Sequence, residues 1–317
     1  MTNDLPSPAQ PLKIGTRGSP LALAQAYETR ARLMAAFDLP DDAFAIVVIK
    51  TSGDDRVLID ADRPLKEIGN KGLFTKEIEE AMLDGFIDIA VHSMKDMPVE
   101  QPAGLLLDTY LPREDVRDAF VSPHHAALAD LPEGAIVGTS SLRRRAQLLS
   151  RRPDLNVVEF RGNVQTRLRK LNDGVAQATF LAMAGLNRLG MDDVPCCAIE
   201  VDDMLPAVAQ GAIGIERRAD DTRARDMLAA IHDGVTAQRL AAERAFLAAL
   251  DGSCETPIGA LAELDGDMLR LRGEILRPDG SACYSDAAEG AIADGPKIGR
   301  AMAARLLAQA GPDFFKA

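Results

Sequence analysis

The sequence has few cysteines and no long apolar run, and each shortage excludes a large class of protein. Four cysteines in 317 residues are too few for a disulfide framework, and Cys196 and Cys197 are adjacent and poorly placed to bridge each other. No apolar run approaches the roughly 20 residues that cross a bilayer. The first residues, MTNDLPSPAQP, lack the basic and apolar regions of a signal peptide. We therefore expect a reduced, cytoplasmic protein without a membrane span.

Nucleotide-binding and metal-binding signatures are missing as well. The sequence has neither G-x-G-x-x-G after a strand nor G-x-x-x-x-G-K-[ST], so nothing in it indicates a nucleotide cofactor. Its four histidines include no pair spaced four residues apart and no nearby Cys-x-x-Cys. No metal site is expected.

Positive charge is in the minority and unevenly spread. The formal net charge is −12, which argues against nucleic acid as a partner, because binding nucleic acid needs a broad basic face. Residues 140–152, SSLRRRAQLLSRR, nevertheless place five arginines in a segment that is typical of a short helix. A local arginine patch in an acidic protein suggests a small polyanionic ligand.

Apolar runs of strand length alternate with helical patterns along most of the chain. Residues 12–17 read as a strand, and Ser19 and Pro20 as the N-cap and first residue of a helix over 20–36. The alternation continues to about residue 205 and predicts mostly parallel sheets with helices on both faces. The remainder predicts a smaller α+β domain, with helices near 235–250 and 296–310.

A short echo links two parts of the chain. IGTRGSPLALAQ (14–25) and VGTSSLRRRAQ (137–147) share a strand ending in Gly-Thr, a serine near a helix start, and Ala-Gln later in the helix. Chance similarity is one interpretation. The other is a pair of similar lobes that face each other across a cleft, each aiming helix-start N–H groups at an anion.

Cys254 occupies an unusual position, in the loop of LAALDGSCETPIGA (247–260) between Gly252 and Pro257. A cysteine that merely packs usually lies in a strand or helix among apolar neighbours, whereas this one is placed to present its sulfur. A Cys–His hydrolase stays open at this point, since the histidine need not be close in sequence.

Residues 87–100, IDIAVHSMKDMPVE, read as a strand that runs into a turn carrying Lys95 and Asp96. Ligands of open α/β sheets bind at the carboxyl ends of strands, so Asp96 is expected to be buried in a cleft; a solvated turn aspartate is the alternative. His92 is interpreted as a structural histidine.

Eight segments, in order, resemble the porphobilinogen deaminase (hydroxymethylbilane synthase) family. They are TRGSPLALAQ, NKGLFTKEIE, DIAVHSMKDMP, VGTSSLRRRAQL, LRKLNDG, AGLNRLG, LPAVAQGAIGIE and DGSCETPIGA. The resemblance implies two α/β lobes like those of periplasmic binding proteins and a small α+β domain that carries the cofactor cysteine. Lobe 1 would hold 1–111 and 212–230, with 211–216 crossing back to complete it; lobe 2 would hold 112–211 and the C-terminal domain 231–317.

The resemblance also implies a reaction. Four molecules of porphobilinogen would condense head to tail, each losing ammonia to give a cationic azafulvene that the terminal pyrrole attacks. Growth would start from a dipyrromethane cofactor joined to Cys254 by a thioether, and hydrolysis would release hydroxymethylbilane for haem biosynthesis. Family precedent implies a monomeric transferase. Asp96 would stabilise each cation and assist proton transfer.

Motif positions assign the remaining site residues. The cofactor would be bound by Lys95, Ser141, Arg143 and Arg144, and the substrate carboxylates by Arg17, Ser19, Arg161, Arg167, Arg188 and, in a mobile cover loop, Lys71. Within the helix over 142–152 we expect Leu142, Ala146 and Leu149 to form the buried apolar face. Arg143 and Arg144 would lie off that face and reach the cleft.

Three positions depart from the family pattern: Ser253 beside the cofactor cysteine, Val116 where proline is usual, and Glu67 where some members have lysine. Two rival functions stay open. A two-lobed binding module for a small polyanion would need neither a tethering thiol nor Asp96. A cysteine-dependent hydrolase would need a histidine beside Cys254.

Overall fold

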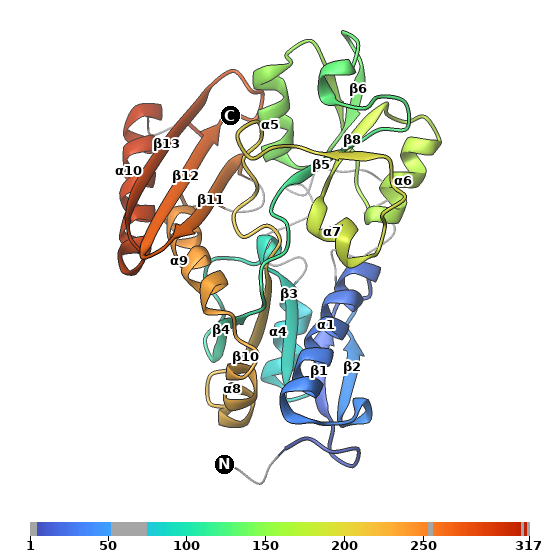
Figure 1. Ribbon diagram of the computed structural model, residues 1–317, viewed down its shortest axis with the longest axis vertical. Helices are drawn as coiled ribbons and strands as arrows, with labels where there is room; N and C mark the ends of the chain where they lie inside the picture. The colour runs from blue at the N-terminus through green and yellow to red at the C-terminus, as the bar shows by residue number, and fades with distance from the viewer. Residues whose placement is uncertain (1–4, 52–74, 253–255, 312–313, 316–317) are drawn as a thin grey trace. The chain divides into compact units, whose positions relative to one another are not determined.

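The computed structural model describes residues 5–51, 75–252, 256–311 and 314–315. The chain divides into two compact units (Figure 1). Of the described residues, the first unit holds 5–51, 75–114 and 212–237, and the second holds 115–211, 238–252, 256–311 and 314–315.

The first unit is built on a five-stranded sheet in the order β2-β1-β3-β10-β4. Its strands are β1 (Leu12–Thr16), β2 (Phe44–Val48), β3 (Ile89–Ser93), β4 (Leu105–Tyr110) and β10 (Ile213–Arg218). β1 runs parallel to β2 and β3, whereas β10 is antiparallel to β3 and β4. The chain thus returns from far along the sequence to complete this sheet.

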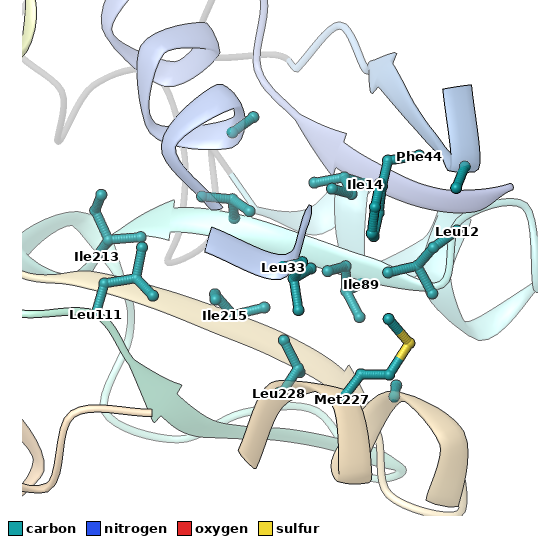
Figure 2. Packing of buried hydrophobic residues seen from close by; sticks show 14 residues of the cluster. Leu12, Ile14, Leu33, Phe44, Ile89, Leu111, Ile213, Ile215, Met227 and Leu228 are labelled. Carbon is teal, nitrogen blue, oxygen red and sulfur yellow. The ribbon is translucent and has the colours of Figure 1, made fainter. Parts of the chain in front are cut away.

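Helices cover both faces of the first sheet. They are α1 (Pro20–Phe37), α4 (Lys76–Leu83) and α8 (Thr222–Ala229), and a short 3₁₀ helix spans Asp41–Ala43. Ile14 and Ile89 pack with Leu33 of α1 and Leu228 of α8 in one core (Figure 2). Ala90, the next residue along β3, points to the opposite face and packs in a second core with residues of α4.

The second unit contains a sheet of the same design, in the order β7-β6-β8-β5-β9. Its strands are β5 (Asp118–Val121), β6 (Ile136–Gly138), β7 (Asn156–Val158), β8 (Ala178–Ala182) and β9 (Cys196–Ala198). β6 runs parallel to β7 and β8, and β5 is antiparallel to β8 and β9. The helices are α5 (Leu142–Arg151), α6 (Val164–Asn172), α7 (Met183–Arg188) and the 3₁₀ helix Leu128–Asp130.

The rest of the second unit is an antiparallel sheet packed on helices. Strands β11 (Ile258–Asp265), β12 (Met268–Leu276) and β13 (Cys283–Ala291) form a meander. Helices α9 (Gly234–Ala249), which begins in the first unit, and α10 (Gly295–Ala310) accompany it, with a 3₁₀ helix at Ile292–Asp294. A Cβ at Gly273 of β12 would meet Phe246 of α9 and Met302 of α10, so both helices pack on one face of this sheet.

The predicted fold class is confirmed: two lobes with mostly parallel sheets are accompanied by a small α+β part. The predicted boundary between lobe 2 and the C-terminal domain stays a prediction, because residues 115–211 and 238–317 fall in one compact unit. Within the described part of the chain, none of the helices has both the length and the apolar character that a membrane span requires.

Candidate active site

A pocket of about 80 Å³ opens in the first unit at the carboxyl ends of β1 and β3. Arg17 and Ser19 directly follow β1, and Asp96 follows β3. Because these parallel strands are neighbours, the residues after them meet at one edge of the sheet. Three predicted site residues therefore line one pocket. Its polar lining includes Arg17, Ser19, Gln25, His92, Ser93 and Asp96.

Two polar contacts fix the segments around this pocket. The Ser19 hydroxyl accepts a hydrogen bond from the Ala22 backbone N–H at 3.3 Å, so Ser19 caps α1 with Pro20 at its start, as predicted. Gln25, one turn further along α1 and buried, hydrogen-bonds to the Ser93 hydroxyl at 2.8 Å. The start of α1 is thereby tied to the end of β3, just before Asp96.

The expectation of a buried Asp96 is wrong, since its side chain is exposed at the pocket. The reason is the 3₁₀ turn Met94–Asp96 that follows β3. Met94 is 1% exposed and packs into the core, and the turn carries the next two residues outward. Lys95, on the same turn, is half-buried.

A buried acid–base pair lies at the same pocket. His92 Nε2 is 3.1 Å from Glu216 Oε2, and both side chains are buried. His92 is therefore a partnered histidine, as interpreted from the sequence. Burial raises the pKa of the nearby Glu79 carboxyl, and the negative charge of Glu216 raises it further.

The second unit carries Ser141, Arg143 and Arg144 at the start of α5. The Ser141 hydroxyl accepts from the Arg144 backbone N–H at 3.4 Å and caps the helix. Both arginines are buried and form ion pairs with Asp118. Although burial alone would raise it, the pKa of the Asp118 carboxyl is held far below its usual range by the two guanidinium charges.

The predicted buried face of α5 is wrong. The buried residues are Arg143, Arg144, Ala146, Gln147 and Leu148, whereas Leu142 and Leu149 are only half-buried. The physical reason is Asp118, which neutralises guanidinium charge inside the unit and so allows arginines on a buried helix face. Helical periodicity alone could not indicate a partner more than twenty residues away.

Three other predicted arginines lie near the carboxyl ends of strands of the second sheet. Arg161, buried, follows β7. Arg167 lies in the first turn of α6, and its Nε donates to the Gly162 carbonyl at 2.9 Å. Arg188 ends α7, which follows β8, and its Nη2 donates to the Gly211 carbonyl at 3.1 Å. Since β7, β6 and β8 are parallel neighbours, these segments and Ser141 all leave the same edge of the sheet.

Two predicted residues lie outside the described part of the chain. Cys254 falls in 253–255 and Lys71 in 52–74, so their assignments stay predictions.

The sequence echo corresponds to equivalent places in the two units. Ser19 and Ser141 cap helices that follow β1 and β6, which have equivalent positions in the two sheets, and the glutamines that end the echo, Gln25 and Gln147, are both buried. Sequence reasoning did not single out these glutamines as site residues, although the repeated Ala-Gln could have done so. It also missed Asp118 and Glu216, for which no local pattern was available.

Comparison with known proteins identifies the family. The family model described as porphobilinogen deaminase, dipyromethane cofactor binding domain, matches residues 12–226, and the one described as porphobilinogen deaminase, C-terminal domain, matches 237–308. The porphobilinogen deaminase of Paracoccus denitrificans is 68% identical over 311 residues, covering 98% of both chains. That of Nitrobacter winogradskyi is 55% identical over 302 residues, covering 95% of this chain and 94% of the relative.

The solved structure of the methionine binding protein MetQ is 14% identical, with a TM-score of 0.42, and covers 71% of this chain and 91% of that one. This likeness is too distant to carry an argument. The two family models and the identity with curated relatives over almost the whole length decide the matter: the chain belongs to the porphobilinogen deaminase family.

Proposed function

We propose that this chain condenses four molecules of porphobilinogen head to tail and then hydrolyses the product to release hydroxymethylbilane. In each condensation a carbon–carbon bond forms, the bond from the aminomethyl carbon to nitrogen breaks, and ammonia leaves. The observation that carries the proposal is the 68% identity, over 98% of both chains, with a porphobilinogen deaminase. The chain would act as a transferase of tetrapyrrole (haem) biosynthesis.

The residues of the second unit suit a cofactor that carries carboxylates. Arg143 Nε is buried and has no hydrogen-bond partner among the described residues, and two guanidinium groups share the one carboxylate of Asp118. This leaves one positive charge for a ligand. We assign dipyrromethane to Ser141, Arg143 and Arg144, with Lys95 as a further contact and Cys254 as the thioether attachment. When bound, the cofactor supplies the pyrrole end to which substrate is added.

Asp96 is assigned the catalytic role in the first unit. Its carboxylate lines the pocket, where it would stabilise the positive charge that develops on porphobilinogen as ammonia leaves. It would also assist the transfer of the proton lost from the pyrrole carbon. A positioned acid–base group of this kind contributes about 10²–10⁴ in rate.

Arginines are assigned to the acetate and propionate groups of the substrate. Arginine binds carboxylates through two parallel hydrogen bonds and stays charged when partly buried. In the first unit this role falls to Arg17, with the Ser19 hydroxyl beside it at the pocket. In the second unit it falls to Arg161, Arg167 and Arg188, and Lys71 completes the assignment.

The test mixes purified protein with porphobilinogen and follows ammonia release and porphyrin colour after oxidation. Asp96→Ala is expected to fold and to lose about 10²–10⁴-fold in kcat, whereas Asp84→Ala, at an exposed aspartate of the same unit, keeps its rate. Cys254→Ser is expected to lose both signals, and Cys197→Ser neither. Near-normal turnover by Asp96→Ala or Cys254→Ser would reject the corresponding assignment.

Intact mass provides a second, independent measurement. Protein made in a haem-competent host is expected to weigh more than the bare polypeptide by the mass of the cofactor. A mass equal to the amino acids alone would contradict the tethered-cofactor proposal. The cytoplasmic location and the monomeric state stay predictions from the sequence.

A further inference from the structure

One carboxylate bridges the two arginines at the start of α5. Asp118, the first residue of β5, is fully buried. Its Oδ2 accepts from Arg143 Nη1 at 2.7 Å, and its Oδ1 accepts from Arg144 Nη2 at 2.7 Å and Nε at 3.1 Å. Gln210 Nε2 donates to the same Oδ1 at 3.0 Å. Each oxygen of Asp118 therefore holds one guanidinium group.

Neutral groups complete the enclosure of both arginines. Arg143 Nη1 also donates to Gln147 Oε1 at 2.8 Å and to the Leu205 carbonyl at 2.9 Å, and Arg144 Nη1 donates to the Phe180 carbonyl at 2.8 Å. Gln147 is itself fixed, because its Nε2 donates to the Leu205 carbonyl and to Glu274 of β12. The guanidinium groups are thus held from several elements, and Asp118 is the anion that contacts both.

In the part of the chain that the structure describes, Asp118 is the carboxylate in contact with these two guanidinium groups, whereas the buried carboxylate of Glu274 reaches the cluster through Gln147. Two guanidinium groups face one carboxylate, and Arg143 Nε is buried without a hydrogen-bond partner among the described residues. A buried donor without a partner is costly unless a ligand satisfies it. Both the surplus charge and the free donor suit one further carboxylate.

We propose that Asp118 is the positioning residue of the cofactor site. It holds Arg143 and Arg144 in place and neutralises one of their two positive charges, so that the other is available to one carboxylate of the bound cofactor. The inference rests on the proposed function. A carboxylate shared by two guanidinium groups restricts the rotation of both, so less freedom is lost when the ligand binds. The same carboxylate prevents the repulsion of two adjacent buried cations from displacing either side chain.

The main test is the fraction of purified, folded chain that carries the cofactor mass, measured by intact mass spectrometry. In Asp118→Asn the ratio of loaded to unloaded chain is expected to fall about 10- to 100-fold, the loss typical of one hydrogen bond to a charged group. The KM of the remaining loaded chains for porphobilinogen is expected to change less, because the carboxylates of porphobilinogen are assigned to other arginines. The control is Asp154→Asn, which removes the partner of Arg152, a half-buried pair at 2.7 Å in the same unit.

Two further measurements keep the proposal testable if Asp118→Asn does not fold. Asp118→Glu keeps the charge and moves its oxygens by one methylene, and it is expected to load less than wild type and more than Asp118→Asn. In the wild-type chain labelled with ¹⁵N-arginine, the Arg143 Nε–H is expected to exchange more slowly with solvent after cofactor loading.

The outcomes separate the inference from the proposed function. Folded Asp118 variants that load as fully as wild type, or an Arg143 Nε–H signal that loading leaves unchanged, would overturn the positioning role. A wild-type chain that gains no cofactor mass and releases no ammonia would instead overturn the proposed function.

Discussion

His92 on β3 and Glu216 on β10 form a buried pair, with 3.1 Å between Nε2 and Oε2. The strands are antiparallel, and His92 is directly opposite Gly214. Glu216 lies two residues beyond Gly214 and so faces the same side of the sheet. The returning strand therefore brings a carboxylate to the histidine of the pocket that Asp96 lines.

Removing this carboxylate should destabilise the first unit. Glu216→Leu leaves His92 Nε2 buried without its acceptor, and we expect a loss of about 1–3 kcal/mol in the free energy of unfolding. Glu216→Gln keeps an oxygen at the same place and should lose less. Urea unfolding measures both, and the same Glu216→Leu change in a His92→Phe background should cost clearly less. Equal costs in the two backgrounds would show that the pair is not coupled.

Glu79 should make the stability of the first unit depend on pH. Burial raises the pKa of this carboxyl in the folded chain above its ordinary value of 4.5, and the negative charge of Glu216 raises it further. The folded state therefore binds the proton more tightly than the unfolded state, so stability is lost as the pH rises through the raised pKa. Glu79→Gln cannot lose a proton, and its Tm relative to wild type should increase from pH 4 to pH 7.

The control for this experiment is Glu100→Gln, which removes a charge from an exposed glutamate of the same unit. It accounts for the change in net charge, and the comparison uses the difference between the two variants at each pH. A Tm difference for Glu79→Gln that is constant, or that shrinks as the pH rises, would contradict the assigned direction.

Ser19 is assigned two roles, as helix cap and as substrate contact, and two substitutions separate them. Ser19→Ala removes the cap and should cost about 1 kcal/mol of stability, whereas Ser19→Gly should cost only a few tenths. Both remove the hydroxyl from the pocket, so both should raise KM for porphobilinogen to a similar degree. If KM instead follows stability and rises only in Ser19→Ala, the hydroxyl acts through the helix and not on the substrate.

Local signals predicted the frame of the site well. Ser-Pro after a strand indicated where α1 begins, and the structure has Ser19 as its N-cap. The echo between 14–25 and 137–147 indicated two similar lobes, and the two sheets have the same order and strand directions. These features depend on neighbouring residues, so sequence patterns can carry them.

The same patterns could not predict contacts between residues far apart in the sequence. Arg143 and Arg144 are buried, contrary to expectation, because Asp118 on β5 pairs with both of them. Glu216 contacts His92 only because β10 returns to the first sheet. Asp96 was placed correctly after β3, but its exposure depends on which way one 3₁₀ turn points. A residue's type and spacing do not fix any of these.

Gly15 in β1 and Gly138 at the end of β6 differ in what an added side chain would meet. A Cβ at Gly138 would overlap the ring of Phe160, which is fully buried, whereas a Cβ at Gly15 would overlap only the terminal methyl of Ile87. A ring held in a packed core cannot move aside as a methyl group can. Gly138→Ala should therefore cost about 1–3 kcal/mol and Gly15→Ala less, as measured by urea unfolding.

Gly138→Ala should also weaken substrate binding, since Phe160 directly precedes Arg161. The backbone N–H of Phe160 donates to the Ser140 hydroxyl at 2.9 Å. A shifted ring moves Arg161 away from substrate, so KM for porphobilinogen should rise with little change in kcat. Gly234→Ala, which places a Cβ in open space at the start of α9, is the control and should change neither stability nor KM by much. If Gly138→Ala matches Gly15→Ala in stability and wild type in KM, then Phe160 does not hold Arg161 in place.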